Sequence, residues 1–180
     1  MRTGSLVVAA TLLLALAGCV PVDSKPSATP SASATPVFAS DAEALAAAEK
    51  AYAAYVHVSD QILIDGGAHP ERLKPITSAT LYADELKGFQ LTAKNGWHST
   101  GGTTYDHFSL EKYNPRDPSE LVVAYVCSDV SHVDVVDSAG TSVVSPDRPE
   151  RTPFEVTFAL EETEKLVIAS DEVWTGGGVC

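Results

Sequence analysis

The sequence predicts an α+β domain in which N-terminal helices pack against a curved antiparallel sheet. Apolar residues recur at helical spacing over residues 41–94, whereas from Trp97 onward the pattern changes to the alternation that is typical of strands. The strand segments follow one another with short turns between them, as in antiparallel hairpins. Helices followed by a run of strands indicate an α+β arrangement, because an α/β fold would alternate the two.

The first helix is predicted over residues 41–64. Ser40 followed by Glu43 forms a capping box at its start, and Gly66-Gly67 is the signal for its end. Between these signals, six residues recur at helical spacing and predict its buried side: Leu45, Ala48, Tyr52, Tyr55, Ser59 and Ile62.

A short helical turn and a second long helix come next. Pro70 predicts a turn that runs to Lys74, since proline suits the first position of a helix. The second helix is predicted from Ser78 to Lys94, and Asn95-Gly96 stops it. Its apolar side is predicted to consist of Leu81, Tyr82, Leu86, Phe89 and Ala93.

The rest of the chain predicts strands joined by turns. Asp137 to Gly140 and the acidic residues 161–164 are the turn signals. In one strand, alternation places Phe154, Val156, Phe158 and Leu160 on a common face. The predicted strands are 97–113 with an interruption at Gly101-Gly102, 120–136, 141–145, 153–160 and 165–174.

The N-terminus has the organisation of a secretory signal. Arg2 is followed by an apolar run over residues 6–15, which is too short to cross a membrane, and then by small residues. The tetrad Leu16-Ala17-Gly18-Cys19 resembles the lipobox of bacterial lipoproteins of the Gram-positive type. This resemblance implies that Cys19 carries diacylglycerol and becomes the first mature residue. The alternative is an ordinary cleaved signal followed by a chance cysteine.

Three regions follow from this N-terminus: a signal peptide over residues 1–18, a lipidated Cys19 with a linker to residue 40, and one α+β domain over residues 41–180. The linker is rich in Ser, Ala, Thr and Pro and has too few large apolar side chains to offset its ordering entropy. We therefore expect a disordered tether. It would hold the domain on the extracytoplasmic face of the cell membrane, attached through the lipid alone.

The charge of the chain bears on its partners. Its 180 residues carry a formal net charge of −12, with 12 basic and 24 acidic side chains. Removal of Arg2 with the signal peptide makes the mature chain more acidic still. Such a surface repels nucleic acid phosphates and anionic lipid headgroups. We therefore expect no nucleic acid partner and contact with the membrane only through the anchor.

The three cysteines also fit an exported protein. Lipidation of Cys19 leaves Cys127 and Cys180, and an even pair in an exported domain predicts a disulfide. A catalytic cysteine or a metal thiolate is the alternative. No second Cys or His lies at metal-ligand spacing from either residue, so we expect neither a metal nor another cofactor.

The order and size of the elements over residues 41–174 resemble the NTF2-like, cystatin-like roll. Members of that family often hold an apolar cavity between the helices and the concave sheet, and some are isomerases or dehydratases with an Asp or His base inside it. The resemblance implies a similar cavity here. The catalytic candidates in this chain are His57, Asp60, Tyr105 and His107, with Asp106 and His132 as further titratable residues.

Each candidate also has a structural interpretation. His57 and Asp60 are three residues apart on a helix, which fits a surface ion pair as well as an oriented imidazole. Tyr105 and His107 share one face of a strand, which is exposed or lines a cavity. The surface ion pair and the exposed strand face are the favoured interpretations, and the sequence shows no catalytic constellation. The expected function is therefore a non-enzymatic module that binds a small ligand or a protein, and the alternative is an NTF2-like cavity enzyme acting on a small apolar substrate.

Overall fold

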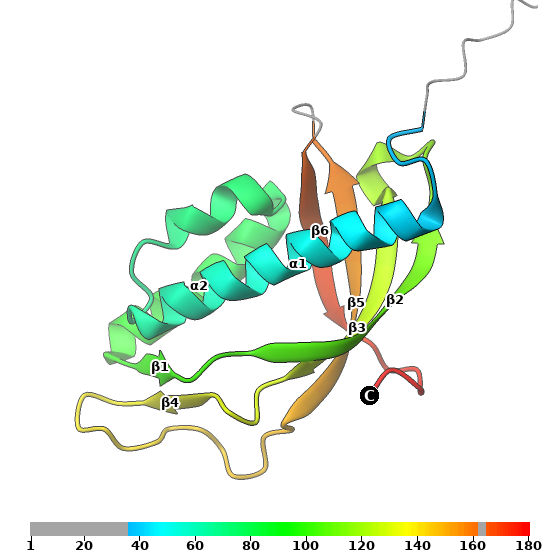
Figure 1. Cartoon of the computed structure of the whole chain (residues 1–180). Helices are drawn as coiled ribbons and strands as arrows, with labels where there is room; N and C mark the ends of the chain where they lie inside the picture. The colour runs from blue at the N-terminus through cyan, green and yellow to red at the C-terminus, as the bar shows by residue number, and fades with distance from the viewer. Residues whose placement is uncertain (1–35, 162–164) are drawn as a thin grey trace, which may run out of the picture. The chain divides into compact units, whose positions relative to one another are not determined.

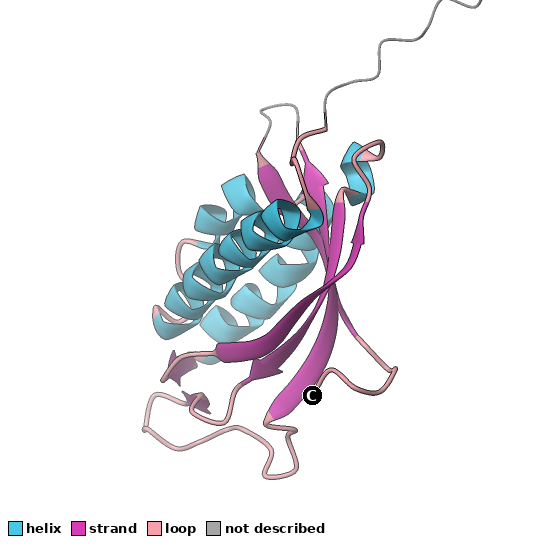
Figure 2. Cartoon of the chain, turned by 45° about the vertical axis from the view of Figure 1, so that its right-hand side comes forward, coloured by secondary structure: helices cyan, strands magenta, loops and turns pink. Residues whose placement is uncertain are grey.

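Helices cover one face of a curved antiparallel sheet, so the domain has two layers (Figures 1 and 2). This arrangement is seen in a computed structural model, which describes residues 36–161 and 165–180. The signal peptide, Cys19 and most of the linker lie outside the described residues, as do residues 162–164 of the predicted acidic turn. The α+β prediction is confirmed.

The helical layer consists of α1 (Asp41–Ile64), the short 3-10 helix η1 (Pro70–Ile76) and α2 (Ala79–Asn95). The predicted bounds of the long helices are confirmed to within a residue. The predicted turn at Pro70 continues two residues beyond its expected end. Gly96 ends α2 in the left-handed conformation, with a φ of 66°, as a C-terminal glycine commonly does.

The predicted capping box is present at the start of α1. The Ser40 Oγ accepts a hydrogen bond from the Glu43 backbone N–H at 3.2 Å, and the Ala39 backbone N–H donates to Glu43 Oε2 at 2.8 Å. Two backbone N–H groups near the helix start, one of them in its first turn, are thereby paired with side-chain oxygens.

Replacing this cap should weaken the domain measurably. We expect Ser40→Ala to lower the free energy of unfolding by about 1 kcal/mol, because the Glu43 N–H loses its side-chain acceptor. Ser40→Asp keeps an acceptor and serves as the matched control. Urea denaturation of the three chains measures the effect, and equal midpoints for Ser40→Ala and the parent chain would contradict it.

The buried side of α2 agrees with the prediction at Leu81 and Phe89 and differs from it toward the end of the helix. Leu81, Phe89 and Thr92 are buried, whereas Ala93 is exposed. The helix is therefore rotated by a fraction of a turn from the expected orientation, and this rotation turns Glu85 toward the sheet. The pattern of apolar residues in the sequence does not reveal this rotation, because one position on the inward side of the helix is occupied by the carboxylate of Glu85.

The main sheet has four antiparallel strands in the order β2-β3-β5-β6. A separate two-stranded sheet pairs β1 with β4 near the C-terminal end of α1 (Figure 1). The strand bounds are β1 (His98–Thr100), β2 (Thr104–Tyr113), β3 (Val122–Asp129), β4 (Asp134–Val136), β5 (Arg151–Leu160) and β6 (Leu166–Val173), and a one-turn 3-10 helix η2 (Pro118–Glu120) precedes β3.

Two strand predictions need correction. The strand predicted over residues 120–136 is interrupted at 130–133, where the chain turns away from the main sheet to form β4. His132 lies in that turn and not on a strand face. The strand predicted over residues 141–145 is reduced to an isolated bridge between Ser142 and Val136. Valines favour strands in both segments, but a short segment without a neighbouring strand over its whole length does not extend a sheet.

A register shift in β6 determines which of its side chains face the helices. Phe158 lies opposite Ile168, yet the preceding residue Thr157 lies opposite Ser170, so one extra residue is accommodated between them. Beyond this bulge, Asp171 lies opposite the buried Val156. The bulge therefore places a carboxylate on the helix-facing side of the sheet, where simple alternation places Ser170.

The core lies between α1 and the helix-facing side of the sheet. The predicted common face of β5 is confirmed, because Val156 and Phe158 are fully buried and Phe154 and Leu160 pack against the same cluster. Tyr52 of α1 contacts Phe108 of β2, with ring centroids 5.7 Å apart. Aromatic and branched side chains thus fill most of the space between the layers.

The predicted disulfide between Cys127 and Cys180 is confirmed, with the two Cα atoms 5.2 Å apart. Cys127 alternates with core residues of β3, so the bond lies on the sheet face opposite the helices. Trp174 stacks against Tyr125 on the same face, with ring centroids 4.7 Å apart. The C-terminal segment is therefore held against the sheet face opposite the described helical layer (Figure 2).

Candidate functional site

An open cavity of about 370 Å³ lies between α1, α2 and the sheet. Its volume falls in the lower part of the range for small-molecule sites. Apolar walls come from Tyr52, Val56 and Phe154, among others. The polar side chains that line it are Tyr55, Ser59 and Asp60 of α1, Glu85 of α2, Thr103, Ser128 of β3 and Asp171 of β6.

One tyrosine links two carboxylates in this cavity. The Tyr55 hydroxyl donates a hydrogen bond to Glu85 Oε1 at 2.9 Å and is also within hydrogen-bonding reach of the Asp171 carboxyl. Burial is the main cause that raises the pKa of Glu85, and the Asp84 charge adds to it. The pKa of Tyr55 is likewise raised, chiefly by burial and then by the nearby Asp171, so the phenol keeps its proton. The Tyr55 proton is therefore donated to Glu85, although the Asp171 carboxyl lies beside the same hydroxyl.

Asp171 is the most perturbed carboxyl of the cavity. Burial raises its pKa to about 7, and the neighbouring Glu85 charge adds to this effect. Although part of the residue reaches the surface, its Oδ1 exposes less than 1 Å² and has no hydrogen-bond partner among the described residues. Ser59 Oγ is a second buried atom of the cavity wall without such a partner. Buried polar atoms normally have partners, so these two atoms leave unused hydrogen-bonding capacity in the wall of one cavity.

Asp60 is the one predicted site residue that lines the cavity. Both of its carboxylate oxygens are engaged at 2.8 Å, Oδ2 with the Thr103 backbone N–H and Oδ1 with the Thr103 hydroxyl. Asp60 therefore ties α1 to the chain entering β2. Its oxygens are already paired, which gives it a positioning role rather than a reactive one.

The other predicted residues lie elsewhere. His57 is exposed on α1, and His107 is exposed in a bulge of β2 with a φ of 52°. The His107 Nδ1 lies 2.6 Å from Asp106, which also accepts a hydrogen bond from Arg151. Tyr105 is half-buried, and its ring packs on the edge of Tyr52 at a centroid distance of 5.0 Å. The four candidates thus do not converge on one point.

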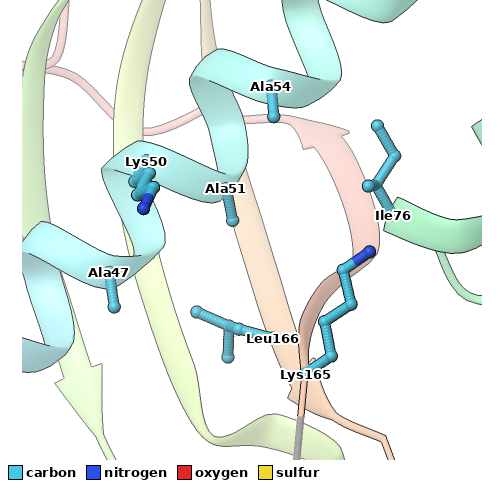
Figure 3. A pocket seen from close by; sticks show the side chains of 7 residues that line it. All are labelled: Ala47, Lys50, Ala51, Ala54, Ile76, Lys165 and Leu166. Carbon is cyan, nitrogen blue, oxygen red and sulfur yellow. The ribbon is translucent and has the colours of Figure 1, made fainter. Parts of the chain in front are cut away.

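A second hollow, on the other side of α1, is a groove of about 390 Å³ (Figure 3). Figure 3 shows Ala47, Ala51 and Ala54 along the helix, facing Leu166 and Ile76, with Lys50 and Lys165 beside them. The Lys165 Nζ already donates to the Pro75 carbonyl oxygen at 2.5 Å. Among the described residues lining this groove, none has a buried polar atom without a partner. The unused hydrogen-bonding capacity found in the first cavity is therefore not seen at the described residues that line this groove.

Neither a metal centre nor a membrane span emerges from the described part of the chain. No group of three or more His, Cys, Asp or Glu side chains is arranged there to hold a metal ion. None of the helices described is both long and apolar enough to cross a membrane.

Sequence reasoning missed Glu85 and Asp171 for different reasons. Glu85 lies four residues after Leu81 and four before Phe89, so helical spacing did offer a signal for it. Asp171 had no such signal, because alternation from Leu166 and Ile168 directs it to the other face. Tyr52, Tyr55 and Ser59 were correctly predicted on the inward side of α1, and there they line the cavity.

Comparison with known proteins supports the fold. No known family model matches the chain, and no curated protein sequence matches it. Among solved structures, the chain is similar to the intermembrane space region of the chloroplast protein ARC6, with a TM-score of 0.50 and 11% identity over 72% of this chain and 95% of that one. A designed β-sheet protein matches with a TM-score of 0.33, 16% identity and coverage of 72% and 88%. At 11% identity, the likeness to the ARC6 region indicates a similar mixed fold of helices and strands and nothing about activity.

Proposed function

We propose that this chain is a lipid-anchored extracytoplasmic protein whose domain binds a small molecule in the cavity between α1, α2 and the sheet. The N-terminal signal with its lipobox supports the anchor, and the predicted tether supports a domain held away from the membrane. The cavity supports ligand binding rather than a purely structural role. The proposed role is non-enzymatic.

The observation that carries this proposal is a pair of buried atoms in the wall of one open cavity, Asp171 Oδ1 and Ser59 Oγ, for which the described residues supply no hydrogen-bond partner. Leaving a buried polar group without a hydrogen bond costs about 1–3 kcal/mol. A ligand that supplies the missing hydrogen bonds recovers this free energy on binding. Apolar side chains beside these atoms supply the remaining contact area, which is the usual composition of a small-molecule site.

Ligand capture tests this part of the proposal. Full-length protein extracted from membranes in detergent should retain a small molecule that native mass spectrometry detects. We expect Ser59→Phe to abolish retention, because the added ring fills the cavity from α1. Ala54→Phe places the same ring in the groove of Figure 3 and should leave retention unchanged. Equal retention by Ser59→Phe and the parent chain would place the ligand elsewhere.

The anchor has its own test. We expect the mature chain to begin at Cys19 and to carry the mass of a diacylglycerol group, so that it partitions into detergent. Cys19→Ala should remove the modification and release the domain from membranes, since at least two acyl chains are needed for stable attachment. An N-terminus at another residue, or an unmodified Cys19, would refute the lipoprotein assignment.

One observation favours a cavity enzyme as a second candidate. A general base works best with a pKa near the working pH, and burial brings the pKa of Asp171 to about 7 beside the Tyr55 hydroxyl. In that case the reactive group is Asp171 rather than His57, Asp60, Tyr105 or His107. A captured compound that changes its mass on incubation with the parent chain, but not with Asp171→Asn, would establish turnover.

A further inference from the structure

We propose that the ligand of this cavity is a small organic cation with N–H donors, such as a primary ammonium, held by Asp171, Glu85 and Ser59. This inference rests on the proposed ligand-binding function and specifies the chemical class of the ligand.

The charges of the cavity wall point to a cation. Three carboxyl side chains line it, Asp60, Glu85 and Asp171, and no Lys, Arg or His is among its described lining residues. Burial and mutual repulsion oppose ionisation of the last two, and the attraction of an opposite charge placed between them offsets both penalties. An anionic ligand would add to the repulsion and leave the acceptors unpaired. A neutral ligand would leave the repulsion in place.

The hydrogen-bonding groups of the cavity wall indicate a ligand that carries several N–H donors. Carboxylates only accept, and the one described hydroxyl between Glu85 and Asp171 is that of Tyr55, whose proton is used by Glu85. Asp171 Oδ1 therefore has no donor among the described residues, and Ser59 Oγ can accept a second hydrogen bond from a ligand. A primary ammonium carries three N–H donors in a compact head, which suits acceptors that come from a helix and a strand on opposite walls.

The apolar side chains that line the cavity indicate what the rest of the ligand is like. Tyr52, Val56 and Phe154 provide apolar and aromatic surface beside the acidic groups. Aromatic faces also attract cations, by about 0.5–1 kcal/mol or more when water is excluded. With a volume of about 370 Å³, the cavity fits a cation that bears one ring or a short aliphatic chain.

Proton competition follows from the same geometry. The titratable groups that face Asp171 are Tyr55 and Tyr52 of α1 and Glu85 of α2. Asp60 of α1 also lines the cavity, and none of these four side chains carries a positive charge. Below its pKa of about 7, Asp171 holds a proton that a cation must displace. Affinity for a cation should therefore rise about tenfold from pH 6 to pH 8 and release a proton.

Three ring compounds of similar size make the test: benzylammonium, neutral benzyl alcohol and anionic benzoate, titrated by calorimetry into the full-length protein in detergent at pH 8. We expect benzylammonium to bind at least tenfold more tightly than the other two. Asp171→Asn and Glu85→Gln should each weaken it at least tenfold. The matched controls Glu172→Gln and Glu49→Gln remove exposed carboxylates that do not line the cavity and should leave the affinity unchanged.

Each possible outcome of these titrations either supports or overturns the proposed cation site. Preference for benzylammonium that both cavity variants abolish, together with the rise from pH 6 to pH 8, supports the cation site. Tighter binding of benzyl alcohol or benzoate, with loss in Ser59→Phe, would overturn the cation while leaving a ligand-binding cavity. Equal losses in the control variants would show general electrostatic attraction and overturn the assignment to Asp171. Absence of binding by all three probes would also overturn it, and capture of a compound from membranes would still test the proposed function independently.

Discussion

Removal of the Cys127–Cys180 bond by Cys180→Ala should lower the free energy of unfolding by about 4 kcal/mol. The bond joins residues 53 apart in sequence, and closing a loop of that size in the unfolded chain has about this effect in the chain-entropy model. Cys180 is exposed whereas Cys127 is fully buried. Changing only the exposed partner therefore removes the crosslink without opening a cavity in the sheet.

Guanidinium denaturation of the full-length chain with and without a thiol reductant measures this effect. The reductant should destabilise the parent chain by a similar amount and leave Cys180→Ala unchanged. Gly177→Ala alters the same segment at a position where a methyl group meets no neighbouring atom, and it should have little effect. Identical midpoints for the parent chain and Cys180→Ala would show that the bond contributes nothing to stability.

Asp171→Asn should stabilise the domain at pH 8, although it removes a side chain of the proposed binding site. In the fold, burial raises the pKa of Asp171 from 3.8 to about 7. Each tenfold change in proton affinity corresponds to about 1.4 kcal/mol, so the charged form in the fold loses about 4 kcal/mol at most. We expect a gain of about 2 kcal/mol, because the amide that replaces the carboxylate also lacks a full set of partners.

The pH dependence distinguishes this mechanism from a general packing effect. Between pH 3.8 and pH 7 the folded state keeps the Asp171 proton and the unfolded state loses it, so stability falls as the pH rises through this window. The variant should lack this contribution and differ most from the parent above pH 7. Asp129 shows the opposite sign, because hydrogen bonds from Ser131 and Arg151 lower its pKa to about 2. Its stabilising contribution is present above pH 3.8 and is lost as the pH falls toward 2.

Urea denaturation of the parent chain, Asp171→Asn and Glu172→Gln at pH 5 and pH 8 tests this prediction. The Glu172 variant removes the neighbouring exposed charge and should change stability little at either pH. A stabilisation by Asp171→Asn that is equal at pH 5 and pH 8 would refute the role of ionisation. Since the same substitution should weaken binding of benzylammonium, the proposed site would hold a carboxylate that reduces stability and contributes to binding.

Local signals in the sequence were sufficient for most of the fold. The capping box at Ser40, the glycine end of α2 and the alternation in β5 each depend on residues a few positions apart, and the hydrogen bonds at the two helix ends form within one helix or turn. The disulfide was also predictable, because once Cys19 is set aside only two cysteines remain. The strand over residues 141–145 failed because a strand needs a partner, which no local pattern supplies.

The sequence by itself determined the α+β class, the helix bounds, the disulfide pair and the inward side of α1, since helical and strand periodicity act over neighbouring residues. The lipid anchor at Cys19 stays a prediction from the sequence, outside the described residues. Only the tertiary structure decided the site. The bulge in β6 turns Asp171 toward the helices, and the rotation of α2 places Glu85 against it. Both depend on how distant elements pack, because packing decides which residue a bulge absorbs and which side of a helix meets the sheet.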